Sequence, residues 1–248
     1  NKSFIEIQDF GNDTIYKILK KKKINKFKYF QKVIKRLSQI QSIKIRKIKN
    51  FKGKNYVIPK YNTTILSRET NLFYEWYARK KLPKKKIVSF TKKFRKITKN
   101  LILNLKLKNN VFVHRDFHVA NLMLVNNKIG VIDSQDALIG NKAYDLASLI
   151  DDVRFKTSKS LKDKIYKHYI NRQIEINKTK FKNDFEIFSI IRNLKIIGIF
   201  TRLAIRDNKK NYLKLIPNAW DLISSRINDN KLFFELKKLL NENFKRKI

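Results

Sequence analysis

Apolar and polar residues follow the period of an α-helix in three stretches of the first hundred positions. From Thr14 to about Ile40, apolar side chains recur every three or four residues, and the run Lys20–Lys23 predicts a solvated break in that helix. Residues 63–82 predict a second helix, which ends at Pro83 because proline cannot continue a helix. A third helical pattern covers about residues 87–105. Helices therefore dominate this part of the chain.

Strand patterns are shorter. The opening segment Lys2–Phe10 alternates apolar and polar residues as a half-buried strand does, Gly11 ends it, and Asn12 or Asp13 is expected to cap the next helix. Three further runs favour strands: Val111–Val113, Leu122–Val125 and Lys128–Ile132. The pair Asn126–Asn127 between the last two is typical of a two-residue hairpin turn.

After Gly140 the pattern is helical to the end of the chain. The predicted helices cover about residues 143–153, 159–175, 182–206, 209–227 and 231–245. Residues 42–62 look irregular, and Asn109 with Asn110 is expected to end the third helix. The fold class predicted from these patterns is α+β and predominantly helical, with helices around a small β-hairpin.

The charge of the chain is strongly unbalanced. Lysine and arginine number 59 against 20 acids, a formal net charge of +39 over 248 residues. Such a charge is typical of proteins that bind nucleic acid or another anionic surface. Coding DNA rich in A and T produces the same excess, and here lysine far outnumbers arginine and is spread over the whole length. We therefore expect non-specific attraction to polyanions and no specific nucleic-acid partner.

Other features of the composition exclude several kinds of protein. Cysteine is absent, which excludes disulfides, thiolate metal sites and a cysteine nucleophile. No run approaches the roughly 20 apolar residues that a membrane helix needs. The opening residues lack the apolar core of a signal peptide. We expect a cytoplasmic protein without a membrane partner.

The acids gather in one region of the sequence. Six acids and four bases lie between Val111 and Arg154, although bases far outnumber acids in the chain. Carboxylates are the usual ligands of Mg²⁺, which prefers oxygen. Asp116 follows one predicted strand, Asn121 precedes the next, and Asp133 follows the third. The hairpin would bring these three side chains together at one edge of a small sheet.

Two carboxylates and an amide suit phosphoryl transfer. One carboxylate can accept the proton of an attacking hydroxyl, while the amide and the other carboxylate hold Mg²⁺ on phosphate oxygens. The segment HRDFHVAN (114–121) matches the kinase catalytic-loop pattern H-R-D-x-x-x-x-N at every fixed position. We expect His114 to brace this loop, and Asp151 and Asp152 to be surface charges at a helix end.

With these motifs, the sequence resembles the aminoglycoside phosphotransferase and choline kinase family, small-molecule kinases with a protein-kinase-like fold. His118, two residues after Asp116, gives the H-x-D-x-H-x-x-N form typical of small-molecule kinases. Asp133 is followed by Ser-Gln, so the D-F-G of protein kinases is absent, and no A-P-E follows. Within the family, GVIDSQDALIG, YDLASLIDD, GIFTRLAIRD, ETNLFYEWY and FIEIQDFGNDT are similar to segments of the bacterial N-acetylmuramate/N-acetylglucosamine anomeric kinases. The resemblance covers roughly residues 3–225.

The resemblance implies a role for each motif residue. Asp116 would be the catalytic base, and Asn121 and Asp133 would be the Mg²⁺ ligands. The residues that would brace the loop are His114, His118 and Asp145, the last by accepting backbone N–H bonds. ATP would be the phosphoryl donor, and the fold would be a protein-kinase-like C-terminal lobe whose small β-hairpin carries the catalytic site.

Recognition of the acceptor would fall to the helical lobe. A sugar site needs carboxylates for hydroxyls, an aromatic ring for the face of the sugar and arginine for a lactyl carboxylate. Possible substrate-binding residues are Asp136, Glu69, Glu75, Trp76, Arg202 and Arg206. The alternatives are core packing for Trp76 and a surface ion pair for Arg202.

The beginning of the chain departs from this family. Family members carry an N-terminal lobe with a β-sheet, a phosphate-covering loop and a phosphate-binding lysine, whereas FIEIQDFG resembles the segment that links the two lobes. No two of the five glycines are close enough for such a loop, and the first residue is not Met. We expect residues 1–12 to be a hinge segment from a missing lobe and residues 13–248 to be the helical C-terminal lobe. The alternative, a strand at Asn55–Lys60 that bears the lysine, is disfavoured by Pro59.

Three functions remain open. The first is an ATP- and Mg²⁺-dependent kinase of a small hydroxylated molecule, and the resemblance implies the anomeric hydroxyl of N-acetylmuramate or N-acetylglucosamine in cell-wall recycling. The second is a basic nucleic-acid-binding protein. The third is an inactive kinase-like fragment that binds a partner. On the first interpretation, the chain as given is expected to turn over little or no ATP.

Overall fold

The computed structural model describes residues 8–50, 52–228 and 230–244, most of which are helical. The α-helices are α1 (Ile15–Leu19), α2 (Lys26–Gln41), α3 (Thr63–Leu72), α4 (Arg79–Lys81), α5 (Lys84–Leu103), α6 (Ala143–Ile150), α7 (Lys159–Asn171), α8 (Lys178–Arg206), α9 (Ile216–Ile227) and α10 (Phe234–Asn243). The other helical segments are the π-helix η1 (Phe73–Ala78) and the 3₁₀-helices η2 (Val119–Asn121), η3 (Lys210–Leu215) and η4 (Lys231–Phe233). The strands are β1 (Lys47–Lys49), β2 (Asn55–Val57), β3 (Asn109–Val113), β4 (Leu122–Val125), β5 (Lys128–Val131) and β6 (Leu138–Asn141).

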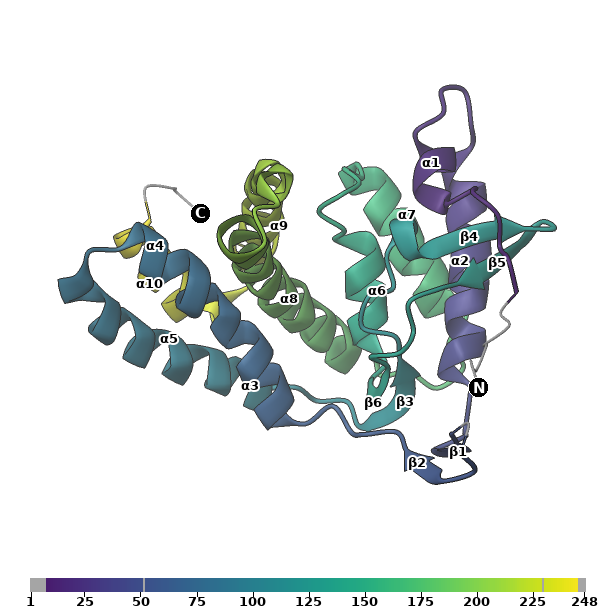
Figure 1. The fold of residues 1–248 in the computed structure, drawn as a ribbon, viewed down its shortest axis with the longest axis horizontal. Coiled ribbons are helices and arrows are strands. Elements are labelled where there is room, and N and C mark those ends of the chain that lie inside the picture. Colours follow the sequence, from purple (N-terminus) through teal and green to yellow (C-terminus); the bar gives the residue numbers. More distant parts are fainter. Residues whose placement is uncertain (1–7, 51, 229, 245–248) are drawn as a thin grey trace, which may run out of the picture.

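The long helix α8 runs through the middle of the fold (Figure 1). α3, η1, α6 and α9 pack along it. In Figure 1, α3, α5 and α10 lie on one side of α8, while α2, α6, α7 and most of the short strands lie on the other. The predominantly helical α+β fold predicted from the sequence is therefore confirmed. No described helix combines the length and the apolar character that crossing a bilayer requires.

The predicted hairpin is present as β4 and β5. Leu122 lies opposite Val131, and the strands are antiparallel. Asn126 and Asn127 have φ of 46° and 62°, the left-handed conformation that a tight two-residue turn requires. A Cβ added at Gly130 would lie 2.9 Å from the ring of Phe10, so glycine allows the chain ahead of α1 to lie close against the hairpin.

β3 belongs to a different sheet from the hairpin. It pairs with β6, with Val113 opposite Leu138, and it includes Asn109 and Asn110, which were expected to end the preceding helix. That helix, α5, ends earlier, at Leu103. β6 was not predicted, because its four residues are all buried and lack the alternation that marks a half-buried strand.

The N-terminal helical stretch is divided, as the four lysines predicted, and residues 20–25 separate α1 from α2. Thr14, rather than Asn12 or Asp13, caps α1, because its hydroxyl accepts a backbone N–H of the first turn at 3.1 Å. The predicted strand Lys2–Phe10 lies outside the described residues except for its last three, which are not in a strand.

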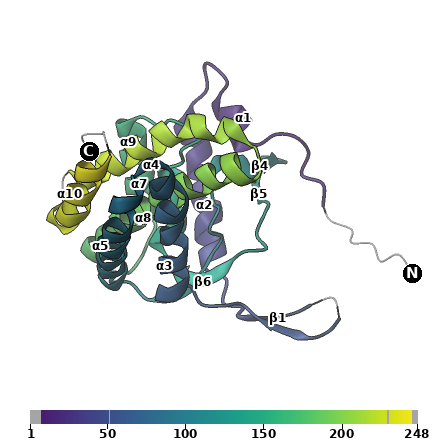
Figure 2. The same ribbon diagram turned by 60° about the vertical axis from the view of Figure 1, so that its left-hand side comes forward.

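The region predicted to be irregular contains a hairpin. β1 and β2 pair with Ile48 opposite Tyr56, and the hairpin extends away from the rest of the protein (Figure 2). Both strands have three residues and are exposed, so they carry no core pattern that sequence analysis could detect. The segment Asn55–Lys60 thus does contain a strand, but among the described residues β2 pairs with β1 alone.

The second predicted helix is continuous but changes type, from α3 through the π-helix η1 to α4. Its junction with η1 crosses α8 at Gly198, where an added Cβ would lie 2.3 Å from the backbone carbon and oxygen of Leu72. Glycine at this position allows the two helix backbones to touch. The contact holds Glu69, on the last turns of α3, beside α8.

An aromatic cluster joins η1 to the helices around it. Phe73 is fully buried, and its ring centroid lies 5.2 Å from that of Phe94 on α5 and 5.7 Å from that of Trp220 on α9. Burying one such ring stabilises the fold by roughly 2–3 kcal/mol. This cluster fixes α3 and η1 against α8.

Asp151 and Asp152 correct another expectation, because both are buried rather than on the surface. Asp151 forms ion pairs with Lys162 at 2.7 Å and with Arg226 at 3.0 Å. All residues of α6 are buried, so its C-terminal end lies inside the protein and its acids need internal partners.

Candidate active site

The loop after β3 is anchored from two sides. The buried carboxylate of Asp145 on α6 accepts the backbone N–H of His114 at 2.8 Å and that of Arg115 at 3.0 Å. His114 is buried, and its Nε2 donates to the carbonyl oxygen of Ile132 at 2.9 Å. The first two bonds are those that the resemblance implies for Asp145, and the third ties the loop to the end of the hairpin.

Burial governs the pKa of Asp145. Removal from water raises it to about 6, and the backbone N–H bonds from His114 and Arg115 act in the opposite direction. Arg115 has a φ of +74° and Asp133 a φ of +68°, conformations that are uncommon for residues other than glycine. Such strained backbone persists where the surroundings impose it, and it often occurs at functional sites.

Three segments bring Asp116, Asn121 and Asp133 together. The side-chain nitrogen of Asn121 donates to the backbone oxygen of Asp116 at 3.2 Å and to Oδ2 of Asp133 at 3.4 Å. Gln135 donates to Oδ1 of Asp133 at 2.7 Å. All three predicted residues line one cavity of about 370 Å³. The convergence predicted from the sequence is present, although Asp116 follows β3, which is not in the hairpin's sheet.

This pair of oxygen-bearing side chains suits a hard cation. In the part of the chain that the structure describes, no three histidine, aspartate or glutamate side chains are grouped so that they could hold a metal by themselves. Asn121 and Asp133 would therefore supply two ligands, leaving the others to phosphate oxygens and water. Mg²⁺ is usually bound in this way, through one or two carboxylates and the phosphates of a substrate.

Cations surround Asp116. Burial would raise its pKa, but Lys195, Arg192, His118 and Arg115 together lower the pKa below its usual value. Lys195 is itself largely buried on α8, and burial would lower its pKa. Tyr144, Glu69 and Asp116 outweigh that effect and raise it. Both groups are therefore charged at neutral pH.

Glu69 belongs to a network behind the cavity rather than to its lining. Its carboxylate accepts from the hydroxyl of Tyr61 and from Arg115, and it forms an ion pair with Lys195 at 3.0 Å. Burial would raise the pKa of Glu69, but Lys195 and Arg115 lower it by more. The pKa of Glu69 is therefore below its usual value. Glu69 thus connects Arg115 of the loop to Lys195 of α8.

His118 lines the cavity beside Asp116 and is 6% exposed. Burial, with Arg154 adding to it, lowers the pKa of His118 to about 4, while Asp152 and Asp116 oppose the shift. The imidazole is therefore neutral at neutral pH. Its Nδ1 is buried and has no hydrogen-bond partner among the described residues.

The remaining substrate residues predicted from the sequence do not line this cavity. Glu75 and Trp76 lie half-buried in η1. Arg206 is exposed and pairs with its neighbour Asp207 at 2.7 Å. Arg202 is half-buried, and its Nε has no hydrogen-bond partner among the described residues. Asp136 is exposed, and its backbone oxygen accepts from Arg115 at 3.0 Å.

Sequence reasoning missed residues that do line the cavity: Arg154, Arg192, Lys195, Ile196, Ile199, Phe200 and Tyr212. A signal for two of them was present. Arg192 and Lys195 stand three positions apart inside the mostly apolar run FSIIRNLKIIGIF. Arginine and lysine are almost never fully buried unless they are paired, so two cations on one face of a buried helix indicate a functional or paired site.

The chain is similar to several known kinases and phosphotransferases. Residues 61–175 match the phosphotransferase enzyme family, a range that contains Asp116, Asn121, Asp133 and Asp145. The chain is 34% identical over 167 residues to the N-acetylmuramate/N-acetylglucosamine kinase of Neisseria meningitidis serogroup B, covering 65% of this chain and 50% of that protein. The chain thus spans about half the length of this curated relative.

Solved structures with the same fold are more distant in sequence. An ethanolamine kinase of Plasmodium vivax matches with a TM-score of 0.58 at 14% identity, covering 90% of this chain and 66% of that one. A spectinomycin phosphotransferase in its AMP-bound complex matches with a TM-score of 0.57 at 10% identity, covering 89% and 71%. Residues 61–175 are therefore similar to the phosphotransferase enzyme family, and the chain has the protein-kinase-like fold of these phosphotransferases.

Proposed function

We propose that this chain carries the catalytic and acceptor-binding part of an enzyme that transfers the γ-phosphoryl group of ATP to a hydroxyl of a small molecule. One observation carries the proposal: Asp116, Asn121 and Asp133 line the same cavity, together with Lys195 and Arg192. Phosphoryl transfer requires mainly positioning and neutralisation of charge. This cavity offers the carboxylate of Asp116 for the first and the cation of Lys195 for the second.

Asp116 takes the proton of the acceptor hydroxyl. The hydroxyl oxygen forms a bond to the γ-phosphorus while the bond from that phosphorus to the β–γ bridging oxygen breaks, and ADP leaves. The lowered pKa of Asp116 supports this role, because the carboxylate is ionised and can receive the proton at neutral pH. His114 and Asp145 hold the loop that positions it.

Asn121 and Asp133 would hold Mg²⁺ between the protein and the phosphates of ATP. When bound, Mg²⁺ neutralises the charge that the transferred group carries. The oxygen ligands of these two side chains support the assignment, as does their hydrogen bond of 3.4 Å. ATP as the donor is supported by the match to the phosphotransferase enzyme family.

The acceptor is an amino sugar, phosphorylated at its anomeric hydroxyl during the recycling of cell-wall sugars. The name of the meningococcal relative, at 34% identity, supports this substrate. Phe200 and Tyr212, whose ring centroids lie 5.1 Å apart, give the cavity an apolar wall suited to the face of a sugar. Because the chain spans half the length of that relative, the activity of the whole protein is part of the proposal, as is a cytoplasmic location, where ATP is supplied.

A transfer assay tests the proposal, with amino sugars, choline and aminoglycosides as acceptors. It is run on this chain, expected to turn over little ATP by itself, and on any longer form of the protein that contains it. We expect Asp116→Ala and Asp133→Ala to lower kcat/KM by about 1,000-fold or more, because each removes a charge that acts on the reacting groups. Asp163→Ala, at an exposed position of α7, is the matched control. Substantial transfer by either cavity variant would refute the mechanism.

A further inference from the structure

Arg192 is a buried cation in an apolar part of α8. It is 4% exposed, and its neighbours Ile191 and Leu194 are buried as well. Removing a guanidinium from water costs several kcal/mol unless hydrogen bonds and an opposite charge compensate it. A partner for Arg192 is therefore expected close by.

The described residues do not supply a full partner. No carboxylate of the described residues forms an ion pair with Arg192, and its buried Nη1 has no hydrogen-bond partner among them. The guanidinium carbon lies 5.5 Å from the centroid of the Tyr144 ring, an interaction that compensates only part of the missing hydration. The charge of Arg192 contributes to lowering the pKa of Asp116 and of Asp145, but neither carboxylate forms an ion pair with it.

The two other cations that line the cavity are matched. Lys195 pairs with Glu69 at 3.0 Å, and Arg154 lies 3.5 Å from the carboxylate of Asp152. Within residues 8–50, 52–228 and 230–244, Arg192 is thus the cation of this cavity without a carboxylate of its own. The cavity is built with one positive charge that its own side chains leave unpaired.

We infer that Arg192 binds a carboxylate of the acceptor, so that the site selects sugars carrying an acidic substituent over their neutral analogues. The inference rests on the proposed function. A guanidinium presents donors in a planar fork that matches the two oxygens of a carboxylate. A buried donor left unpaired by a neutral sugar would penalise that sugar, which is how buried polar groups generate specificity.

Arg192 is a different residue from the two arginines of α8 that the sequence predicted for this role. Arg202 and Arg206 lie one and nearly two helical turns beyond the cavity-lining residue Ile199 on α8, and neither lines the cavity. Arg192 lies on the same helix, about two turns before Ile199, and does line it. An acceptor that carries a carboxylate calls for an arginine, and in this proposal that arginine is Arg192.

Calorimetric titration of this chain with two sugars tests the inference. N-acetylmuramate carries a lactyl carboxylate, and N-acetylglucosamine is its neutral counterpart. We expect the wild-type chain to bind N-acetylmuramate about 10-fold to 100-fold more tightly, the range for a hydrogen-bonded charge pair. Arg192→Gln should remove most of this preference while leaving the affinity for N-acetylglucosamine within about twofold.

Two further variants control for charge and folding. Arg68→Gln, at an exposed position of α3, removes one positive charge elsewhere and should keep the preference, so that long-range attraction to a highly basic protein is accounted for. Arg192→Lys keeps the charge but loses the fork, and it should keep part of the preference. Retained binding of the neutral sugar by Arg192→Gln reports that the variant is folded.

The outcomes separate this inference from the proposed function. Equal affinity of the wild-type chain for both sugars, or an equal loss for both in Arg192→Gln, would overturn the role of Arg192 while leaving the kinase proposal intact. Binding of neither sugar by the wild-type chain would overturn the inference together with the amino-sugar acceptor. Loss of transfer in Asp116→Ala with an unchanged preference in binding would support both.

Discussion

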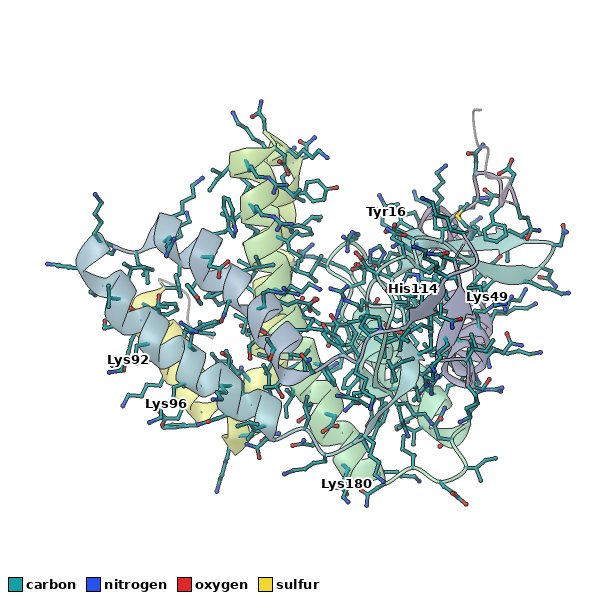
Figure 3. All side chains as sticks on the ribbon, turned by 60° about the horizontal axis from the view of Figure 1, so that its bottom comes forward. Tyr16, Lys49, Lys92, Lys96, His114 and Lys180 are labelled. Carbon is teal, nitrogen blue, oxygen red and sulfur yellow. The ribbon has the colours of Figure 1, made fainter. Side chains whose placement is uncertain are left out.

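Helices α8 and α5 are both rich in cations, yet their charges lie in opposite environments. α5 carries eight lysines and arginines and no acid over its 20 residues. Figure 3 shows Lys92 and Lys96 extending from it, away from the packed interior in which His114 lies. On α8, Arg192 is buried, the side chain of Lys195 is only 12% exposed, and both line the cavity with Asp116.

The difference concerns what one positive charge can do. A solvated lysine interacts weakly, because water and salt screen its field within about 10 Å. Lys195, in contrast, acts on the pKa of Asp116 and holds Glu69. The net charge of +39 therefore describes mainly the surface, whereas the few buried charges carry the information about function.

The largest effect, a loss of folding stability, is expected from a substitution where α8 contacts the end of α3. Gly198→Ala places a Cβ 2.3 Å from the backbone of Leu72, and backbone atoms cannot move aside as a flexible side chain can. We expect the free energy of unfolding to fall by more than about 3 kcal/mol. Denaturant unfolding followed by circular dichroism measures it.

The matching change on α5 is Ser89→Ala, at an exposed position. It should change the free energy of unfolding by less than about 0.5 kcal/mol, with a slight gain in helix propensity. Similar effects of the two substitutions would contradict the close approach of the backbones at Gly198.

The next effect concerns the pH dependence of stability. The pKa of His118 is lowered to about 4 in the fold, from an unfolded value near 6.5. The neutral imidazole is therefore favoured by folding, and its contribution is complete above pH 6.5 and is lost as the pH falls toward 4. His118→Gln should flatten the decline in unfolding free energy between these pH values by up to about 3 kcal/mol.

Denaturant unfolding at several pH values measures this slope. His168 on α7, which is only partly buried, provides the comparison. Burial lowers its pKa as well, so His168→Gln should flatten the slope in the same direction but by less. A larger effect at His168 would exclude burial as the cause at His118.

A smaller effect is expected when one lysine is removed from each helix. Lys195→Met should lower kcat/KM by about 30-fold, or about 2 kcal/mol, because it releases Glu69 and raises the pKa of Asp116. The acid limb of the pH–rate profile should move to higher pH. Lys92→Met removes the same charge from α5 and should leave both quantities unchanged. Stopped-time transfer assays across pH measure them.

The smallest effect is expected from the exposed lysines of α5, and it concerns only the binding of DNA. Replacing Lys92 and Lys96 by Gln should weaken binding to single-stranded or duplex DNA slightly. The slope of log affinity against log salt should fall by at most about one for each lysine that no longer neutralises a phosphate. Transfer to the acceptor should stay the same. Sequence-specific DNA binding of high affinity at physiological salt would favour the nucleic-acid interpretation instead.

The conformation of the loop at residues 114–121 was predictable because its sequence pattern is local. HRDFHVAN fixes four residue types within eight positions, and the turn at Asn126 returns the chain so that Asp133 meets Asn121. The structure supports the placement of these residues, while their roles stay predictions. The hairpin and most helices were predictable for a similar reason, since their periodicity spans neighbouring residues.

The far wall of the cavity was not predictable in the same way. Arg192 and Lys195 reach Asp116 from more than 70 positions away in the sequence, through the packing of α8 against α6. No spacing rule connects two segments so distant, and the arginines predicted from the sequence, Arg202 and Arg206, lie about three and four turns after Arg192 on the same helix. β6 was missed because its burial removes the alternation that identifies a strand.

In the π-helical segment Phe73–Ala78, the number of residues matters as much as their identity, because it sets the orientation of the preceding helix α3. Successive residues of an α-helix differ by about 100° around its axis, and a π-helical turn absorbs one residue more than an α-helical turn does. Deleting a single residue from this segment would let it relax to a regular helix. The preceding part would then swing by about a quarter of a revolution, and Glu69 would be carried away from Lys195. Deleting one residue there would therefore be expected to impair the site as much as a substitution of one of its own residues.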